Sequence, residues 1–340
     1  MSRGYPPDDF RPTASWEVLR LRAELLRSIR RFFDERGFLE VETPVLSGDT
    51  VVDRHLDPFW TADVDRQEEI TPQTRRYFLQ TSPEFGMKRL LAAGGPGAIY
   101  QVTRVFRRGE WGPLHNPEFT MVEWYRVGDN LKTGMALLGD LCDRLFHRGT
   151  PQVQTYGEAF SRFVGVDPHS ASAKELRQTA EKMEVAYPTS LSLDDRDGWL
   201  DLLWSEKVQP HLGRKEPVII CDYPASQAAL AIIREGPPRV AERFELFVDG
   251  IELANGYHEL RDPDELRRRI STANAQRVND GKSPLPENNR LLAAMEAGLP
   301  PSVGVAMGFD RVVMIRAGAK SLREVLAFPF DQITPIIVFW

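Results

Sequence analysis

The sequence predicts an α+β fold in which an antiparallel β-sheet is flanked by helices. Two strand segments, 98–106 and 118–127, are joined by a loop short enough that they most simply pair antiparallel. A second pair, 243–248 and 251–254, meets at Asp249 and Gly250, the strongest short hairpin signal in the chain. Between the two pairs, residues 130–215 are expected to be mainly helical, and residues 218–221 are expected to form a buried strand.

Composition narrows the class of protein before any motif is considered. The 340 residues can form one large domain or two smaller ones. Basic residues number 43 and acidic residues 49, so a nucleic-acid role would need a local basic patch. The only cysteines, Cys142 and Cys221, are far apart, which excludes a zinc ribbon and favours a reducing cytoplasm. Neither a membrane span nor a signal peptide is expected.

The N-terminal part predicts an arm followed by a helix and a strand. Residues 1–14 contain three prolines and mixed charges, and we expect a poorly ordered arm. Ser15 is a plausible N-cap for a helix that Gly37 ends. The segment 38–43 then alternates like a strand until Pro44.

A second helix start follows a short strand at 77–80. Ser82 is expected to cap it, with Pro83 at the first helical position and Glu84 at the positive end of the helix dipole. Capping alone explains these residues without any ligand.

The loop between the first two strands gathers Arg107, Glu110, His115 and Asn116. Guanidinium groups match phosphate oxygens bidentately, so arginines at the mouth of a hairpin suit a phosphate-bearing anion. A solvated charged loop is the simpler alternative for any single arginine.

The strand 118–127 places Phe119, Glu123 and Tyr125 on one face. A carboxylate buried without a partner costs several kcal/mol, roughly, so this face predicts a polar ligand or partner. An edge strand whose Glu123 faces water is an equally good interpretation.

Further along, Glu252 and Glu259 bracket Asn255 near the end of a strand. Their oxygens suit Mg²⁺ held partly by substrate phosphates, although two separate surface glutamates would give the same spacing. After a strand at 303–307, Gly308 opens a helix whose first turn carries Arg311. Residues 130–215 read as a helical insertion with no distinctive chemistry.

These motifs, in this order, resemble the signature motifs of class II aminoacyl-tRNA synthetases. FRRGE with HNPEF is similar to their second motif, GFDR to their third, and FFDERGFLEVETPVL to the first, dimer-forming motif. The nearest branch is lysyl-tRNA synthetase. The resemblance implies one class II catalytic domain over residues 15–340, ATP and Mg²⁺ as cofactors, and a homodimer.

Lysyl-tRNA synthetases carry an N-terminal domain that binds the anticodon, whereas the first motif here begins within the opening residues. The chain therefore resembles the bacterial elongation factor P–(R)-β-lysine ligases, a paralogous family. Ser82 and Ala306 match that family where the synthetases have alanine and glycine. The resemblance implies (R)-β-lysine as substrate, elongation factor P as protein partner, and no tRNA.

The resemblance also implies roles for individual residues. Arg107 and Arg311 would hold the α- and γ-phosphates, and Phe119 would stack on adenine. Glu252 and Glu259 would bind Mg²⁺, while Glu84, Glu123 and Tyr125 would receive the two ammonium groups. Other implied contacts to ATP come from His115, Asn116, Leu253 and Gly308, and those to the amino acid from Ser82, Pro83, Asn255, Glu259 and Ala306.

One motif departs from the family. Where the family usually reads FRNE, this chain has Arg107, Arg108, Gly109 and Glu110, which displaces the glutamate that contacts adenine by one position. We expect Glu110 to take that role after a shift of the loop. The terminal IIVFW has no family counterpart and is expected to be an exposed apolar tail.

Two other functions fit the same motifs. One is a truncated lysyl-tRNA synthetase that activates α-lysine. The other is a catalytically silent module that binds an amino acid or a partner protein, against which the retained arginines and carboxylates argue.

Overall fold

The computed structural model describes residues 10–62 and 74–333, and its chain divides into two compact units. The first unit takes in the chain up to Glu123, residues 267–297, and residue 308 onward. The second comprises residues 124–266 and 298–307. The expected apolar tail and most of the expected N-terminal arm lie outside the described residues, although Thr13 and Ala14 donate backbone hydrogen bonds to Ala327 and Leu326.

Strands β1 (Leu39–Glu40), β5 (Ala98–Phe106) and β6 (Glu118–Val127) are neighbours in that order, and β6 continues into the second unit after Glu123. β1 runs parallel to β5. The Arg107 amide donates to the Pro117 carbonyl at 2.8 Å where β5 passes into β6, as the predicted hairpin requires.

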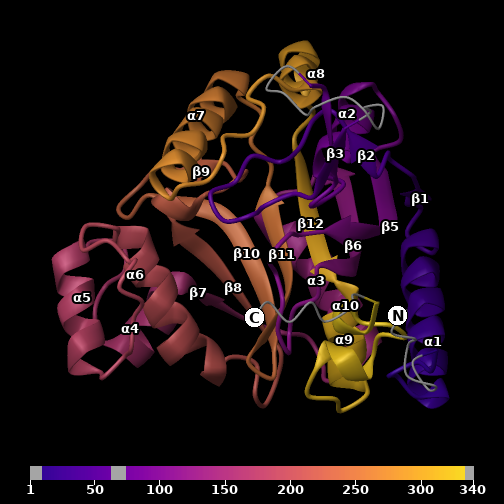
Figure 1. Cartoon of the computed structure of the whole chain (residues 1–340), viewed down its shortest axis with the longest axis horizontal. Helices are drawn as coiled ribbons and strands as arrows, with labels where there is room; N and C mark the ends of the chain where they lie inside the picture. The colour runs from indigo at the N-terminus through magenta and orange to yellow at the C-terminus, as the bar shows by residue number, and fades with distance from the viewer. Residues whose placement is uncertain (1–9, 63–73, 334–340) are drawn as a thin grey trace, which may run out of the picture. The chain divides into compact units, whose positions relative to one another are not determined.

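Helix α1 (Trp16–Asp34) lies beside these strands in Figure 1. Ser15 accepts a hydrogen bond from the Val18 amide, and Gly37 has a φ of 73° directly after the helix, so the predicted start and stop are confirmed. Phe33 stacks on Tyr100 of β5 with ring centroids 4.6 Å apart, which fixes the helix against the strand.

The first unit also contains a small antiparallel sheet of β2 (Leu46–Ser47), β4 (Arg76–Leu79) and β3 (Trp60–Ala62). Neither β2 nor β3 was predicted from the sequence. The other helices of this unit are α2 (Glu84–Ala92), α7 (Pro263–Asn279), which begins in the second unit, α8 (Arg290–Gly298), α9 (Phe309–Arg316), a 3₁₀ turn (Leu322–Glu324) and α10 (Phe330–Ile333).

The position predicted for Pro83 is wrong by one residue. Pro83 is the N-cap of α2, and helix geometry begins at Glu84. The cause is Ser82, whose hydroxyl accepts a hydrogen bond from the Glu84 amide at 3.1 Å and closes a turn ahead of the helix.

In the second unit the strand order is β12-β11-β10-β8-β7, formed by β12 (Ser302–Gly308), β11 (Ile251–His258), β10 (Val240–Val248), β8 (Val218–Pro224) and β7 (Gln152–Thr155), with β9 (Ile233–Arg234) beside β10. The predicted hairpin turn is confirmed, because Asp249 and Gly250 both have positive φ between β10 and β11. The pairing is antiparallel except for β7, which runs parallel to β8.

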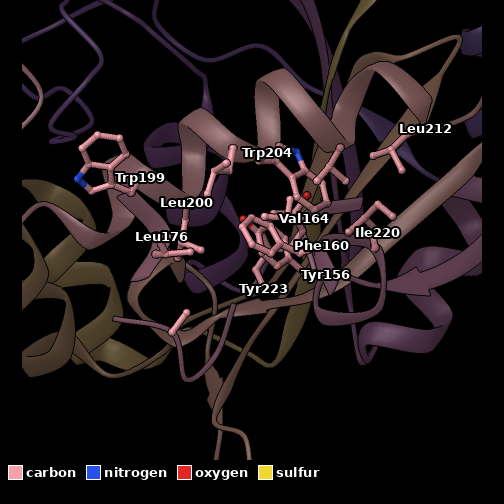
Figure 2. Close-up of a cluster of buried hydrophobic side chains, with 14 of the residues drawn as sticks. Tyr156, Phe160, Val164, Leu176, Trp199, Leu200, Trp204, Leu212, Ile220 and Tyr223 are labelled. Carbon is pink, nitrogen blue, oxygen red and sulfur yellow. The ribbon is translucent and has the colours of Figure 1, made fainter. Parts of the chain in front are cut away.

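Helices α3 (Leu131–Phe146), α4 (Tyr156–Val164), α5 (Ala173–Lys182) and α6 (Arg196–Leu203) belong to this unit, and a π-helical turn (Trp204–Val208) extends α6. Figure 2 shows the apolar core formed by α4, α5, α6 and the π-helical turn, in which Tyr156 stacks on Trp204 with centroids 4.2 Å apart. Tyr223 of β8 joins this core. The segment 130–215 thus holds these helices together with β7, which its polar sequence did not predict.

No helix among residues 10–62 and 74–333 is long and apolar enough to cross a membrane.

Candidate active site

The loop between β5 and β6 (the 107–117 loop) begins at Arg107. The Arg107 guanidinium donates to the Thr81 carbonyl at 3.3 Å and lies over the Phe119 ring, 5.1 Å from the centroid. Glu110 lies 3.7 Å from the Arg107 guanidinium. The structure therefore brings Arg107, Glu110 and Phe119 together, with a cation above an aromatic face.

The same loop contacts the start of α9. Arg311 Nη2 lies 2.9 Å from His115 Nε2, and Arg311 Nε donates to the Leu114 carbonyl. Because a guanidinium only donates, His115 Nε2 must accept, and the imidazole carries its proton on Nδ1. Asn116 is 7% exposed and hydrogen-bonds the Glu118 carbonyl and the Phe330 amide, so its amide group braces the hairpin.

Asp310, next to Arg311, is a positioning residue that sequence reasoning missed. Its carboxylate is buried and accepts hydrogen bonds from the Arg22 guanidinium of α1 and the Thr120 amide of β6. Arg22 also donates to the Thr120 hydroxyl at 2.8 Å. These contacts fix the first turn of α9, and therefore Arg311, against α1 and β6.

Ser82 joins the Glu123 carboxylate to the backbone amide of Glu84. Its hydroxyl donates to Glu123 Oε2 at 2.8 Å and accepts from the Glu84 amide. Glu123 is 1% exposed, so the interpretation in which it faces water is wrong. Pro83, between Ser82 and Glu84, is also buried.

Glu84 already has a cationic partner. Lys88, one helical turn further along α2, is 2% exposed, and its Nζ lies 2.5 Å from Glu84 Oε1. The sequence analysis missed this lysine, although the i,i+4 spacing of the two charges in α2 was a usable signal.

In the second unit, β11 carries Glu252, Leu253 and Asn255. Its register with β10 pairs Ala254 with Leu246 but Glu252 with Phe247, so Leu253 is the extra residue of a β-bulge. The bulge offsets the two-residue alternation and turns Glu252 toward the same face as Asn255. Leu253 itself is 2% exposed.

A buried polar cluster on that face was not foreseen. Glu245 of β10 is 5% exposed and lies opposite Asn255, whose amide donates to it at 3.2 Å. The Tyr223 hydroxyl donates to Glu245 at 2.6 Å, and Arg243 at 2.5 Å. Burial raises the pKa of Glu245 to about 7; Arg243 opposes this rise and the charge of Glu252 adds to it. The signal for this cluster in the sequence was the alternation of Arg243 and Glu245 within a largely apolar strand.

Glu259 and Tyr125 meet at Gly304 of β12. Glu259 is 1% exposed, and a Cβ on Gly304 would lie 2.3 Å from its Oε1 and 2.2 Å from Tyr125 Cε1. Only glycine therefore fits beneath this pair. Ala306 is the register partner of Asn255.

Among the described residues, no group of three or more histidine, cysteine, aspartate or glutamate side chains is arranged to hold a metal. Glu245 and Glu252 nevertheless supply hard oxygen ligands beside the Asn255 amide. Such a set fits Mg²⁺, which is commonly bound by one or two carboxylates together with substrate phosphates.

Comparison with known proteins identifies the family. Residues 7–332 match the model for class II tRNA synthetases (D, K and N). A protein of Vibrio vulnificus named elongation factor P--(R)-beta-lysine ligase is 47% identical over 95% of this chain and 98% of its own length. Proteins with the same name from Vibrio cholerae and Edwardsiella ictaluri are 46% and 45% identical over the same shares. The predicted resemblance and fold class are confirmed: the chain belongs to the class II tRNA synthetase family, among the relatives named elongation factor P--(R)-beta-lysine ligase.

Proposed function

We propose that this protein is an ATP-dependent ligase that activates (R)-β-lysine and transfers it to a lysine side chain of elongation factor P. The observation that carries this proposal is the Ser82 hydroxyl, which donates to the Glu123 carboxylate and accepts from the Glu84 backbone amide. A synthetase-type alanine at this position could not make either hydrogen bond. Relatives named as this ligase match the chain over 98% of their own length, which supports the same activity.

The nucleotide would be bound by residues of the first unit. Phe119 offers adenine an aromatic face, with Glu110 as the acceptor for its amino group. Arg107 and Arg311 would hold the α- and γ-phosphates, and Gly308 allows close backbone approach at the start of α9. Their positive charge offsets the charge that develops as the substrate carboxylate attacks the α-phosphorus and pyrophosphate leaves.

His115 would support the γ-phosphate indirectly. Its Nε2 accepts from Arg311, which orients the guanidinium. Asn116 would act by bracing the hairpin, because both ends of its amide group are engaged by the protein.

Glu252 would hold Mg²⁺, with Glu245 as a second carboxylate and Leu253 shaping the bulge that aims Glu252. When bound, the ion offsets the negative charge of the phosphates. Glu259, first assigned to the metal, also suits a substrate ammonium, because it is buried against Tyr125.

The substrate carries two ammonium groups, and each must meet a carboxylate once it is desolvated. Glu123, held by Ser82, is one acceptor, and Glu84 is a weaker one because Lys88 already offsets its charge. By the family resemblance, Tyr125, Asn255 and Ala306 would also contact the amino acid. No protein nucleophile is needed, since the acceptor lysine amine attacks the acyl-adenylate and AMP leaves.

The decisive experiment is ATP–pyrophosphate exchange with (R)-β-lysine and, in parallel, α-lysine, followed by mass measurement of elongation factor P. We expect exchange with (R)-β-lysine and a mass increase of one lysyl residue on elongation factor P. The variant Arg311→Ala should lose exchange. Strong preference for α-lysine would instead indicate a lysyl-tRNA synthetase, and no exchange with either amino acid would indicate a silent module.

We further propose that the protein is a homodimer that acts in the cytoplasm and does not charge tRNA. Its net charge of −6 supports the last point, because tRNA binding draws on basic surface. Lysine tRNA offered in the same assay should remain uncharged.

A further inference from the structure

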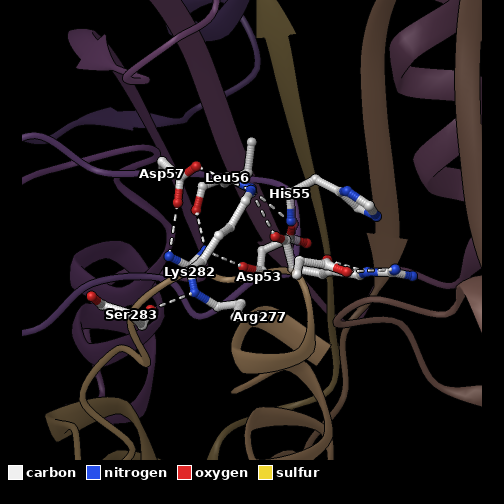
Figure 3. A network of polar contacts seen from close by, with 9 residues as sticks. Asp53, His55, Leu56, Asp57, Arg277, Lys282 and Ser283 are labelled. Atoms are coloured by element: carbon white, nitrogen blue, oxygen red, sulfur yellow. Dashed lines mark hydrogen bonds and ion pairs between the residues drawn. The ribbon is translucent and has the colours of Figure 1, made fainter. Parts of the chain in front are cut away.

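A network of polar contacts joins the last turn of α7 to segment 53–57, which has no regular secondary structure (Figure 3). Its centre is Arg277, whose side chain is 3% exposed although it carries a full charge. The guanidinium donates to the Ser283 carbonyl at 3.1 Å, the Asp53 and Leu56 carbonyls at 2.9 Å each, and Asp57 Oδ1 at 2.8 Å.

Asp57 receives a second cation at its other oxygen. Lys282 Nζ lies 3.0 Å from Asp57 Oδ2 and also donates to the Arg54 carbonyl at 3.1 Å. Burial tends to raise the pKa of Asp57, but hydrogen bonds from Arg277 and Lys282 outweigh burial and lower it. Arg277 and Lys282 therefore hold the segment through the backbone carbonyls of residues 53, 54 and 56 and through the Asp57 carboxylate that they share.

The held segment in turn holds the 107–117 loop. The Asp57 carbonyl accepts a hydrogen bond from the Arg108 amide at 2.7 Å. The preceding amide, that of Arg107, bonds the Pro117 carbonyl on the opposite side of the hairpin. The start of the loop is thus fixed from both sides, once by its own hairpin and once by segment 53–57.

We propose that Arg277 is a positioning residue for ATP binding, acting through segment 53–57 on the 107–117 loop. This inference rests on the proposed function, in which Arg107 contacts the α-phosphate. Displacement of Arg108 would shift Arg107 away from Phe119 and the Thr81 carbonyl, and small displacements of positioning groups cost large factors in rate.

The chemistry of the contacts favours this role over simple stabilisation. A buried ion pair can often be replaced by apolar side chains without loss of stability, so stability alone does not require arginine here. Arg277 directs its planar fork at carbonyls 53 and 56 as well as Asp57, and lysine has no such fork. The guanidinium therefore defines the backbone path that ends at the Asp57 carbonyl.

The test compares Arg277→Lys and Asp57→Asn with the control Arg54→Ala. Arg54 joins the same segment to the same helix end through Asp280, but this pair is more exposed and weaker. Hydrogen–deuterium exchange of the 107–117 loop without ligand is measured first. Michaelis constants for ATP and for (R)-β-lysine follow in the pyrophosphate-exchange assay.

We expect Arg277→Lys to speed hydrogen–deuterium exchange at the Arg108 amide and to lower kcat/KM for ATP on the order of 10- to 100-fold, with a higher KM for ATP. Asp57→Asn should show a smaller change in the same direction, and Arg54→Ala should match the wild type. The KM for (R)-β-lysine should be unchanged in all three variants.

The inference would be overturned if both Arg277→Lys and Asp57→Asn kept the wild-type hydrogen–deuterium exchange rates of the 107–117 loop and the wild-type KM and kcat/KM for ATP. A lower kcat with both Michaelis constants unchanged would also overturn it, since that pattern reports only a smaller folded fraction. If the wild type catalyses no exchange with any lysine, the proposed function fails, and the hydrogen–deuterium comparison then decides the coupling by itself.

Discussion

Single buried side chains change the roles that were predicted for residues of the site. Glu84 was expected to meet a substrate ammonium, yet Lys88 already lies against it, with both side chains at least nine-tenths buried. Glu123 accepts a hydrogen bond from the Ser82 hydroxyl at 2.8 Å. Because Lys88 already offsets the charge of Glu84, we expect Glu84 to contribute less to binding the substrate cation than the resemblance implies.

Replacing Lys88 should show how much its ion pair with Glu84 contributes to the free energy of unfolding. Lys88→Met leaves a buried carboxylate without its cation and should lower the free energy of unfolding by about 3–5 kcal/mol. Urea unfolding at neutral pH measures this. The exposed neighbour Arg89→Ala is the control, and Lys88→Met with Glu84→Gln should recover part of the loss. Equal stability of Lys88→Met and Arg89→Ala would contradict the prediction.

Asp57 should give stability a defined pH dependence. Its pKa in the folded protein lies below the ordinary 3.8, since Arg277 and Lys282 outweigh burial. Its contribution is therefore complete above about pH 4 and is lost as the pH falls through the folded-state pKa.

Asp57→Asn has no charge to lose, so the gap in unfolding free energy between wild type and variant should be constant from about pH 7 to 5 and narrow below about pH 4. Urea unfolding across that range measures the gap. A gap that widened on acidification would show that the Asp57 pKa is raised instead.

At the scale of elements, the predicted hairpins hold, and so does the helix start at Ser15, while the start predicted at Pro83 is one residue early. Features set by a neighbouring strand were missed. The turn at Asp249 and Gly250 depends only on the local residue types, so the sequence predicts it. The bulge at Leu253 and the strand β7 depend on register with a partner, which local alternation does not encode. The bulge matters for the proposed magnesium site, because it decides which way Glu252 points.

Close packing between α3 and β12 gives a prediction at this scale. A Cβ on Gly134 of α3 would lie 2.4 Å from Val303 Cγ1, so Gly134→Ala must push helix and strand apart. We expect a loss of about 1–3 kcal/mol in the free energy of unfolding. Gly48→Ala meets no atom within 4 Å and serves as the control. Equal stability of the two variants would refute the close approach.

For the whole molecule, the proposed homodimer has support in the first unit. Leu39, Val45, Leu46 and Leu90 are exposed there, on or near the first-motif segment. A groove of about 450 Å³, lined by residues that include Thr43, Pro44 and Leu90, lies in the same region. Exposed apolar groups of this kind are typical of an interface.

Sedimentation at micromolar concentration should give twice the 38.6 kDa monomer mass. Leu46→Glu should shift the protein toward monomer, because it buries a charge in the interface. Leu193→Glu, an equally exposed leucine in the second unit, should not. A monomeric wild type would exclude the dimer at that concentration.

The sequence by itself determined the family and the order of the motifs, and it named the residues that we propose to bind ATP and lysine, because these are local patterns of residue types. Only the tertiary structure revealed Asp310, Lys88, Glu245 and Arg277, which act through partners distant in sequence or on a neighbouring turn or strand. Their roles depend on burial and on which oppositely charged or hydrogen-bonding group lies opposite, and packing alone decides both.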